Sequence, residues 1–432
     1  MAMFSKQVGL LGTENAFKIG PKIKAIEDQG KKVIKCNLGE PDFPVPGFIK
    51  EEVKRQIDLD NTHYCDPQGI LPLRQAIARH FGETRGIAAD PQRVVVFPGA
   101  KPPIGLCQMA YCEPGDEVIY PSPGYPIYES FVAYVGAKPV PIHLNEDSGF
   151  TLSGPEIAAA ITPRTRMIYL NFPSNPTGGV ASKEQLGEIA EVIARKCRKD
   201  VRVYSDEVYE HILFDGSRHA SIASCPGMAE RTILVGGASK SFSWTGGRIG
   251  WAMFPTTAEA EVFKNLNINY FSCVAGYNQE GARLGLESPL FAGENRKMID
   301  AFQARRDLVV AGLKRIPGIR CQMPKGAFYV FPNVSEVCES LGIFEAYRRL
   351  PAELQKLTTP STLLQMFLLF EYQVATMDRK SFGRIGTESL HFLRLSIATD
   401  IDSLKEAVSR IGVAAKDAAG FKRFFEKGEN LS

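Results

Sequence analysis

The sequence of 432 residues lacks an excess of charge of one sign. Lys and Arg total 51 and Asp and Glu total 48, which leaves a formal net charge of +3. Without a basic field or a basic cluster, a nucleic-acid partner is not expected. The longest apolar runs, such as the one around 362–370, are far shorter than the ~20 residues of a membrane-spanning helix. No membrane partner is expected either.

Cysteine patterns typical of disulfide frameworks or zinc sites are also lacking. Nine cysteines are scattered along the chain, and none forms a C-x-x-C pair. An odd, unpatterned set is typical of reduced thiols, so we expect no metal site and a cytoplasmic location. The first 20 residues lack the apolar core and the cleavage site of a signal peptide, which favours the same location.

The sequence does contain a regular alternation of helix-like and strand-like segments between about residues 69 and 290. Apolar residues recur at spacings of three and four in segments such as 70–83 and 183–197, which predicts helices. Short β-branched runs predict strands at 94–97, 117–120, 139–143, 167–172, 201–207, 232–237 and 249–254. The alternation indicates an α/β domain around a mostly parallel sheet. Ligands of such sheets bind outside the carboxyl ends of the strands.

The C-terminal part has a different pattern. A long helical segment is followed by a strand-like segment, an irregular stretch, a second strand-like segment and a helix, at 295–316, 326–332, 335–365, 391–399 and 403–417. This order predicts a smaller α+β domain, completed by the N-terminal segment with its strand-like residues near 32–46. We therefore expect a large α/β domain at 48–295 and a small domain formed by 1–47 and 296–432.

Chemically useful residues follow the predicted strands. They are, in chain order, Gly99, Ala100 and Lys101, then Tyr125, then Asn175 in an Asn-Pro-Thr-Gly run, then Asp206 and Tyr209, then Ser239, Lys240 and Arg248. Taken singly, each has an ordinary explanation as a turn, a helix N-cap, a packed aromatic or a solvated lysine. Taken together, they occupy successive strand ends at one edge of a sheet, where a binding site is expected.

This ordered set resembles the fold-type I, pyridoxal-phosphate-dependent aminotransferases of classes I and II. The resemblance runs from about residue 16 to 415 and is most specific in NFPSNPTGG (171–179), YSDEVYEHILFDG (204–216) and GASKSFSWTGGRIGW (237–251). It implies a seven-stranded, mostly parallel sheet in the large domain, pyridoxal 5'-phosphate (PLP) as cofactor and a homodimer with shared active sites. It also implies ping-pong transfer of an amino group between an L-amino acid and a 2-oxo acid such as 2-oxoglutarate.

The resemblance implies a role for each strand-end residue around the cofactor ring. Lys240 would hold the cofactor as a Schiff base and then move protons as general base and acid. Asp206 would keep the pyridinium nitrogen protonated, because a carboxylate stabilises the cation beside it. Asn175 and Tyr209 would donate hydrogen bonds to the ring oxygen, and Tyr125 would stack on the ring and border the substrate.

The phosphate and the substrate would take further residues. Arg248 would supply a fork-like cation to the phosphate, and the donors around it would be Gly99, Ala100, Lys101 and Ser239. Tyr64 resembles the tyrosine that reaches the phosphate from the partner subunit. The α-carboxylate of the substrate would be bound by Arg394, with help from Gly39 and Asn175.

The substrate remains open at this stage. Lys101 occupies a position where relatives that favour aspartate have a lysine for the side-chain carboxylate, but it can equally be a solvated lysine at a helix start. The N-terminal segment reads Glu14–Phe17 where those relatives often have Ser or Thr, so aspartate is favoured only slightly over alanine or an aromatic amino acid. A C–S β-lyase or a related synthase on the same scaffold is the alternative activity. The segment 343–362 looks inserted, and its role is open.

Overall fold

The computed structural model describes residues 3–12, 15–387 and 389–431. A seven-stranded sheet forms its centre, in the order β2-β8-β7-β6-β5-β3-β4. The strands are β2 (Val94–Phe97), β3 (Glu117–Ser122), β4 (Lys138–His143), β5 (Thr165–Asn171), β6 (Arg202–Asp206), β7 (Thr232–Gly237) and β8 (Gly250–Met253). Only β8 runs antiparallel to its neighbours, and the other pairs are parallel. The mostly parallel seven-stranded sheet expected from the sequence is confirmed.

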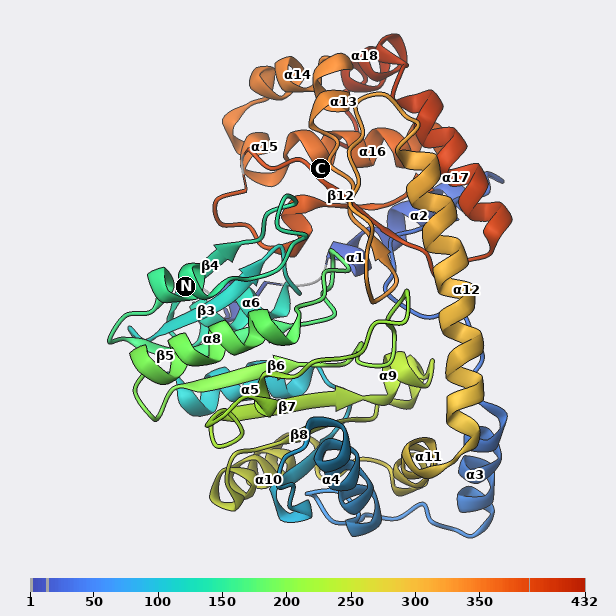
Figure 1. Cartoon of the computed structure of the whole chain (residues 1–432). Coiled ribbons are helices and arrows are strands. Elements are labelled where there is room, and N and C mark those ends of the chain that lie inside the picture. Colours follow the sequence, from blue (N-terminus) through green and yellow to red (C-terminus); the bar gives the residue numbers. More distant parts are fainter. Residues whose placement is uncertain (1–2, 13–14, 388, 432) are drawn as a thin grey trace.

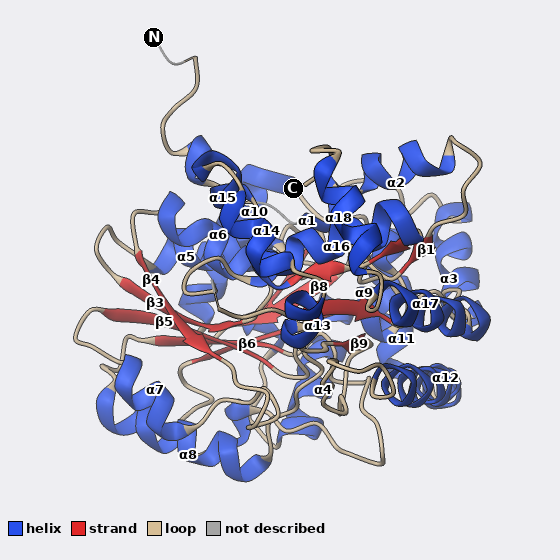
Figure 2. Cartoon of the chain, turned by 90° about the horizontal axis from the view of Figure 1, so that it is seen from above, coloured by secondary structure: helices blue, strands red, loops and turns tan. Residues whose placement is uncertain are grey.

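Helices cover both faces of this sheet (Figure 2). Successive residues of a strand point to opposite faces. In β5, accordingly, Met167 and Tyr169 pack into the core under α5 and α6, whereas Ile168 and Leu170 pack into the core under α8. These helices span Pro102–Tyr111 (α5), Ile127–Tyr134 (α6) and Lys183–Lys196 (α8). Burial on both faces explains why the strands are continuous apolar runs.

Among the described residues, six further helices belong to this region. They are α3 (Gly47–Asp58), α4 (Leu71–Arg85), α7 (Gly154–Ala160), α9 (Ala238–Ser241), α10 (Thr257–Phe271) and α11 (Gly276–Glu287). Helix α12 (Leu290–Leu313) then runs along one side of the molecule, from the neighbourhood of α11 to that of α17 (Figure 1). It agrees with the long helix predicted at 295–316.

Two small sheets lie in the upper part of the molecule, level with the upper half of α12 (Figure 1). Strand β1 (Ile34–Lys35) pairs in parallel with β10 (Val374–Ala375), which joins the N-terminal segment to the C-terminal part of the chain. Strands β11 (Met377–Asp378), β12 (Leu393–Ser396) and β9 (Tyr329–Val330) form an antiparallel sheet in that order. The helices around them are α1 (Asn15–Lys18), α2 (Gly20–Glu27), α17 (Ile401–Ala414) and α18 (Ala418–Glu426).

The expectation of an irregular stretch at 335–365 is wrong. This segment folds into α13 (Ser335–Ser340), α14 (Ile343–Arg349), α15 (Ala352–Leu357) and the start of α16 (Pro360–Tyr372). The breaks fall at Gly342, Pro351 and Pro360, residues that end helices or begin them. Helices of six or seven residues contain fewer than two turns, so the sequence shows no clear helical period there.

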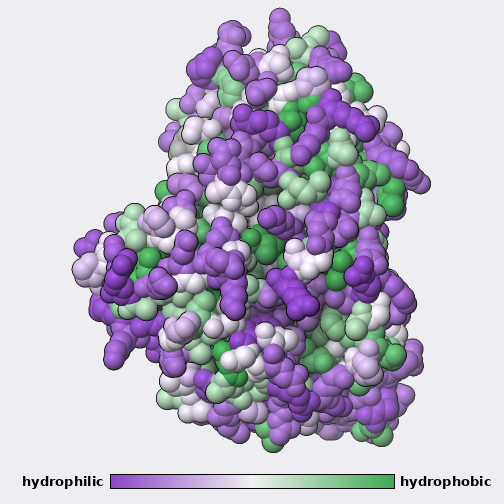
Figure 3. Space-filling model, viewed as in Figure 1, coloured by the Kyte–Doolittle hydropathy of each residue, from purple (hydrophilic) through white to green (hydrophobic). Residues whose placement is uncertain are grey.

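The surface agrees with the balanced composition. On the face seen in Figure 3, hydrophilic residues predominate and hydrophobic residues form small groups. Helix α16 is strongly apolar, but it has 13 residues and is buried in the core of the C-terminal part. Among the described residues, no helix is both long enough and apolar enough to cross a membrane.

Candidate active site

The carboxyl ends of the parallel strands border a cavity of about 540 Å³. Residues from distant parts of the sequence line it. Of the residues expected in the site, they include Gly39, Ala100, Lys101, Tyr125, Asn175, Asp206, Tyr209, Ser239, Lys240, Arg248 and Arg394. The structure therefore brings the strand-end residues together at the edge where the sequence analysis expected a ligand.

Asp206 ends β6, and its side chain is buried. The carboxylate accepts a hydrogen bond from the hydroxyl of Tyr128 at 2.6 Å and a longer one from the backbone N–H of Val208 at 3.4 Å. Burial raises the pKa of Asp206 to about 6, although these hydrogen bonds oppose the shift. A buried carboxylate of this kind is stabilised by a cation placed against it.

Tyr128 is a site residue that the sequence analysis missed. It lies in α6, is fully buried, and stacks on Tyr169 with ring centroids 5.0 Å apart. Its hydroxyl orients the carboxylate of Asp206. In the sequence, candidate site residues are indicated by their position directly after a predicted strand. A tyrosine inside a helix gives no such signal.

Lys240 lies in α9, the single turn of helix that follows β7. Its Nζ donates a hydrogen bond to the carbonyl of Gly39 and lies 5.7 Å and 6.0 Å from the ring centroids of Phe328 and Tyr209. A Cβ atom on Gly39 would lie 2.2 Å from the hydroxyl oxygen of Tyr329, so only glycine fits there. The amine thus faces the cavity between a backbone carbonyl and aromatic rings.

Arg248 and the loop after β2 form a cradle for an anion. The guanidinium donates hydrogen bonds to the carbonyls of Thr245 at 2.7 Å and Pro98 at 3.1 Å. Gly99 has a φ of +94°, and a Cβ atom there would lie 2.2 Å from Nη2 of Arg248. Ala100 and Lys101 line the cavity directly before α5, whose N-terminus attracts negative charge. The cradle fits a phosphate.

Arg394 is buried in β12. One Nη donates to Oδ1 of Asn175 at 3.1 Å and the other donates to the carbonyl of Asn37. The rings of Tyr329 and Phe382 flank the guanidinium at 4.6 Å and 4.8 Å. These contacts fix the plane of the guanidinium, as recognition of a planar carboxylate requires.

Tyr209 and Asn175 line the cavity together with Lys240 and Arg394. The hydroxyl of Tyr209 is 2.8 Å from that of Tyr329, a second site residue that the sequence analysis missed. Asn171 orients Asn175, because its Oδ1 accepts the backbone N–H of Asn175 at 2.9 Å. Tyr329 stands in the predicted strand 326–332, but nothing in the sequence places that strand beside the large sheet.

Residues of opposite charge line another part of the cavity. Lys101 Nζ is 5.9 Å from the ring centroid of Tyr125, and Glu40 accepts a hydrogen bond from Thr245. Ala16 also lines the cavity, whereas Glu14 lies outside the described residues. Besides Lys240, Arg248 and Arg394, the cavity therefore offers a further cationic side chain, at Lys101.

Two expected residues do not line this cavity. Gly99 lies behind it, against Arg248. Tyr64 is 87% exposed and lies outside the wall.

The residues present fit PLP. One cavity is lined by the amine of Lys240, by the buried carboxylate of Asp206, which needs a cation, and by Arg248. The glycine at position 99 leaves room for the Arg248 guanidinium. Together with the sheet, these residues define a PLP-dependent enzyme of fold type I.

Comparison with known proteins leads to the family. Residues 31–411 match the family "Aminotransferase class I and II". The aspartate aminotransferase of Rhizobium meliloti (strain 1021) is 34% identical over 414 residues, which cover 95% of either chain. A probable aspartate/prephenate aminotransferase of Aquifex aeolicus is 34% identical over 96% of this chain and 98% of its own. The crystal structure of the aspartate aminotransferase from Rhizobium meliloti superposes with a TM-score of 0.84, at 34% identity over 96% of this chain and 99% of the other. The chain belongs to the class I and II aminotransferases.

Replacing Gly99 tests the cradle. Gly99→Ala forces an L residue into a left-handed conformation and places its methyl group against Arg248, so the arginine must move. The matched control is Gly86→Ala, where φ is +66° and no atom lies within 4 Å of the added Cβ. We expect the control to cost about 1 kcal/mol of unfolding free energy, as strain alone does. Gly99→Ala should cost more and should also weaken PLP binding. Urea unfolding and PLP titration measure both, and equal effects of the two substitutions would refute the cradle.

Proposed function

We propose that this aminotransferase prefers aspartate as amino donor and a 2-oxo acid such as 2-oxoglutarate as acceptor. The observation that carries the preference is that Arg394 and Lys101 line one cavity, in addition to Lys240 and Arg248, which the cofactor would engage. Arg394 is buried and held in plane, and Lys101 lines another part of the wall. An amino acid with two carboxylates can engage both. The names of the Rhizobium and Aquifex relatives support the same substrate.

When bound, PLP supplies an electron-accepting ring that lets the Cα of an amino acid release a proton. Lys240 would hold the cofactor covalently and, once released by substrate, carry that proton as general base and acid. Its position between the carbonyl of Gly39 and the rings of Tyr209 and Phe328 supports this role. Asp206 would stay ionised beside the protonated ring nitrogen, because a cation offsets the cost of its burial.

Other side chains of the cavity would orient the cofactor. Tyr209 and Asn175 would donate hydrogen bonds to the ring oxygen, and Tyr125 would stack on the ring. Arg248 would pair with the phosphate. The hydroxyl of Ser239 and the backbone N–H groups of Gly99, Ala100 and Lys101 would complete the phosphate site.

Arg394 would bind the α-carboxylate of the substrate through two parallel hydrogen bonds. Its flanking rings support this role, since they restrict rotation of the guanidinium. Asn175 and the backbone of Gly39 would add donors beside it, and Tyr125 would border the substrate. The α-carboxylate is common to all amino acids, so Arg394 would contribute affinity without selecting the side chain.

We also propose a homodimer with shared active sites. Large apolar side chains are exposed at the ends of α3 and α4, at the start of α12 and along α10. They are Ile57, Leu59, Leu71, Val262, Ile268, Tyr270 and Leu290. Figure 1 shows α3, α4, α10 and the start of α12 at one end of the molecule. A second copy would bury this surface and bring Tyr64 to the phosphate of the partner's site.

Two further proposals concern organisation and location. The large domain would span 48–295 and the small domain 1–47 and 296–432, a division supported by the pairing of β1 with β10. We propose a cytoplasmic location because all nine cysteines carry free thiols in the structure.

Single amino acids test the function. Holoenzyme mixed with aspartate alone should convert the bound cofactor to its amine form, seen as a change in absorbance, and added 2-oxoglutarate should reverse it. Balanced formation of oxaloacetate and glutamate would confirm transfer. Release of ammonia and pyruvate from a cysteine conjugate, without any need for a 2-oxo acid, would instead identify the β-lyase.

Lys101→Ser tests the preference for aspartate. Loss of a charged hydrogen bond to the side-chain carboxylate costs about 2 kcal/mol, so kcat/KM for aspartate should fall roughly thirtyfold. Alanine has no second carboxylate, so its kcat/KM should change less than about threefold. Lys101→Arg keeps the charge and should restore part of the activity toward aspartate. Equal losses for the two amino acids would assign Lys101 to the phosphate loop or to solvent.

Hybrid dimers test the role of Tyr64. Lys240→Ala removes the amine from a subunit's own site, whereas Tyr64→Ala weakens the phosphate site of its neighbour. In a mixed dimer one site collects both defects and the other site is native, so activity should exceed that of either parent. The hybrid is purified by two different tags before assay. Activity equal to the mean of the parents would show that Tyr64 acts within its own chain.

A further inference from the structure

A buried charged cluster lies beside the turn that carries three residues of the cavity. Asp206, Val208 and Tyr209 line the cavity, whereas Glu207 and Glu210 do not. Both glutamates are buried, and both contact Arg85, whose side chain is 1% exposed. Along the turn, Asp206, Val208 and Tyr209 therefore face the cofactor site, whereas Glu207 and Glu210 face Arg85.

Arg85 holds the two glutamates together. Its Nε and Nη2 donate to Oε2 of Glu207 at 3.1 Å and 2.6 Å, and Nη2 is 2.5 Å from Oε2 of Glu210. Arg85 is the last residue of α4, so the contact ties the end of that helix to the turn after β6. Two charge-assisted hydrogen bonds converge on one oxygen of Glu207 and fix the position of that carboxylate relative to the end of α4.

Other segments fasten Glu207 from further directions. The hydroxyls of Ser205 and Ser221 donate to its Oε1 at 2.8 Å and 2.5 Å, and Nε2 of His219 lies 2.9 Å from Oε2. Burial alone would raise the pKa of Glu207, but the charge of Arg85 holds it at about 2. The carboxylate is thus ionised at neutral pH and has a partner on each side.

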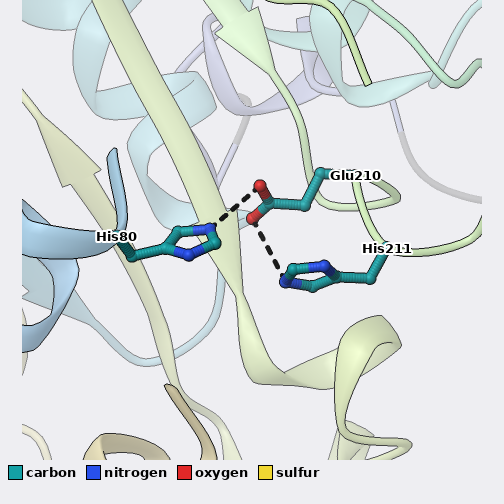
Figure 4. A group of neighbouring side chains, drawn as sticks. All are labelled: His80, Glu210 and His211. Carbon is teal, nitrogen blue, oxygen red and sulfur yellow. Dashed lines mark hydrogen bonds and ion pairs between the residues drawn. The ribbon is translucent and has the colours of Figure 1, made fainter. Parts of the chain in front are cut away.

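Glu210 is the centre of a second group, drawn in Figure 4. Nε2 of His80 lies 3.0 Å from Oε2 and Nε2 of His211 lies 3.8 Å from Oε1. The potential ligand atoms of these three residues lie within 4.8 Å of one another, which is close enough to consider a metal ion.

Arg85 opposes that alternative. Its Nη2 contacts the same oxygen of Glu210 as His80 does, and its Nη1 is 3.4 Å from Nε2 of His80. A metal ion shared by Glu210 and His80 would face the guanidinium at close range, where like charges in a buried site repel strongly. Arg85 already provides the cation that the two glutamates require.

We propose that Arg85, acting through Glu207 and Glu210, is a positioning residue for the cofactor. The cluster fixes the turn 206–210, so that the carboxylate of Asp206 and the hydroxyl of Tyr209 keep their places in the cavity. This inference rests on the proposed PLP site. Groups that contact a reacting molecule must be held within about 0.5 Å, which requires support from residues behind them.

The test must separate positioning from stability, because removing one partner of a buried ion pair destabilises any fold. Glu117 offers a matched control. It is a buried carboxylate that contacts Lys138 at 3.1 Å, Arg164 at 3.0 Å and the hydroxyl of Thr162 at 2.5 Å. It begins β3 and therefore lies at the end of the sheet opposite to the cavity.

The experiment compares Glu207→Gln and Glu210→Gln with Glu117→Gln. The melting temperature of the cofactor-free protein and the dissociation constant for PLP are measured for each variant, with the absorbance maximum of the bound cofactor. We expect all three to lower the melting temperature. PLP binding should weaken at least about tenfold in the first two variants, with a changed absorbance maximum, and less than twofold in the control.

If the glutamine variants fail to fold, a second pair of less disruptive substitutions makes the same comparison. Ser221→Ala removes one donor to Glu207, and Thr162→Ala removes one donor to Glu117. Ser221→Ala should weaken PLP binding more than Thr162→Ala at equal loss of stability.

Equal PLP binding in each matched pair would overturn the positioning role while leaving the proposed function intact. A wild-type chain that does not bind PLP would refute the proposed function and this inference with it. Cobalt(II) titration of the wild type tests whether His80, Glu210 and His211 bind a metal ion instead. Binding of one ion per chain that His211→Asn abolishes would identify a metal site and overturn the proposal.

Discussion

The burial of the Asp206 carboxylate is the constraint on which the site depends. Among the described residues, it accepts hydrogen bonds from the hydroxyl of Tyr128 at 2.6 Å and from the backbone N–H of Val208 at 3.4 Å, at the buried end of β6. Its pKa is raised to about 6. At pH values above the pKa that this carboxyl group has in the unfolded chain, the buried carboxylate therefore makes the folded state less stable. A cation bound against it removes that cost. The free-energy cost of burying the ionised Asp206 carboxylate thus favours binding of a ligand with a protonated ring nitrogen.

The topology of the sheet explains why the other groups meet there. Parallel strands present their carboxyl ends at one edge, so Asn175, Asp206 and Lys240 become neighbours although 65 residues separate the first from the last. The three-stranded sheet of the C-terminal part brings Arg394 and Tyr329 to the same cavity, on its strands β12 and β9. Close approach of backbone and side chain then requires glycine at Gly39 and Gly99. In the proposed function, the residues at the edge of the large sheet would hold the cofactor, and the C-terminal strands would bring Arg394 to the substrate.

Much of this could be predicted from the sequence because the relevant signals are local. Continuous apolar strands with polar residues after them mark the sheet and its active edge, and the segments around Asn175, Asp206 and Lys240 resemble one family closely. Tyr128 and Tyr329 could not be found in this way, since one lies inside a helix and the other belongs to a strand whose place depends on tertiary packing. The short helices between 335 and 365 were missed because none is long enough to show a period. The contacts of Arg85 with Glu207 and Glu210 join residues more than 120 positions apart, and no pattern in the sequence indicates such a pairing.

The central claim is that Lys240 carries the cofactor at the point where these strands meet. Borohydride reduction of the holoenzyme, followed by peptide mapping, tests it most directly, because reduction makes the bond between lysine and cofactor permanent. We expect one label per chain, on the peptide that contains Lys240. A label on another lysine, such as Lys101, or a protein that takes up no label, would contradict it.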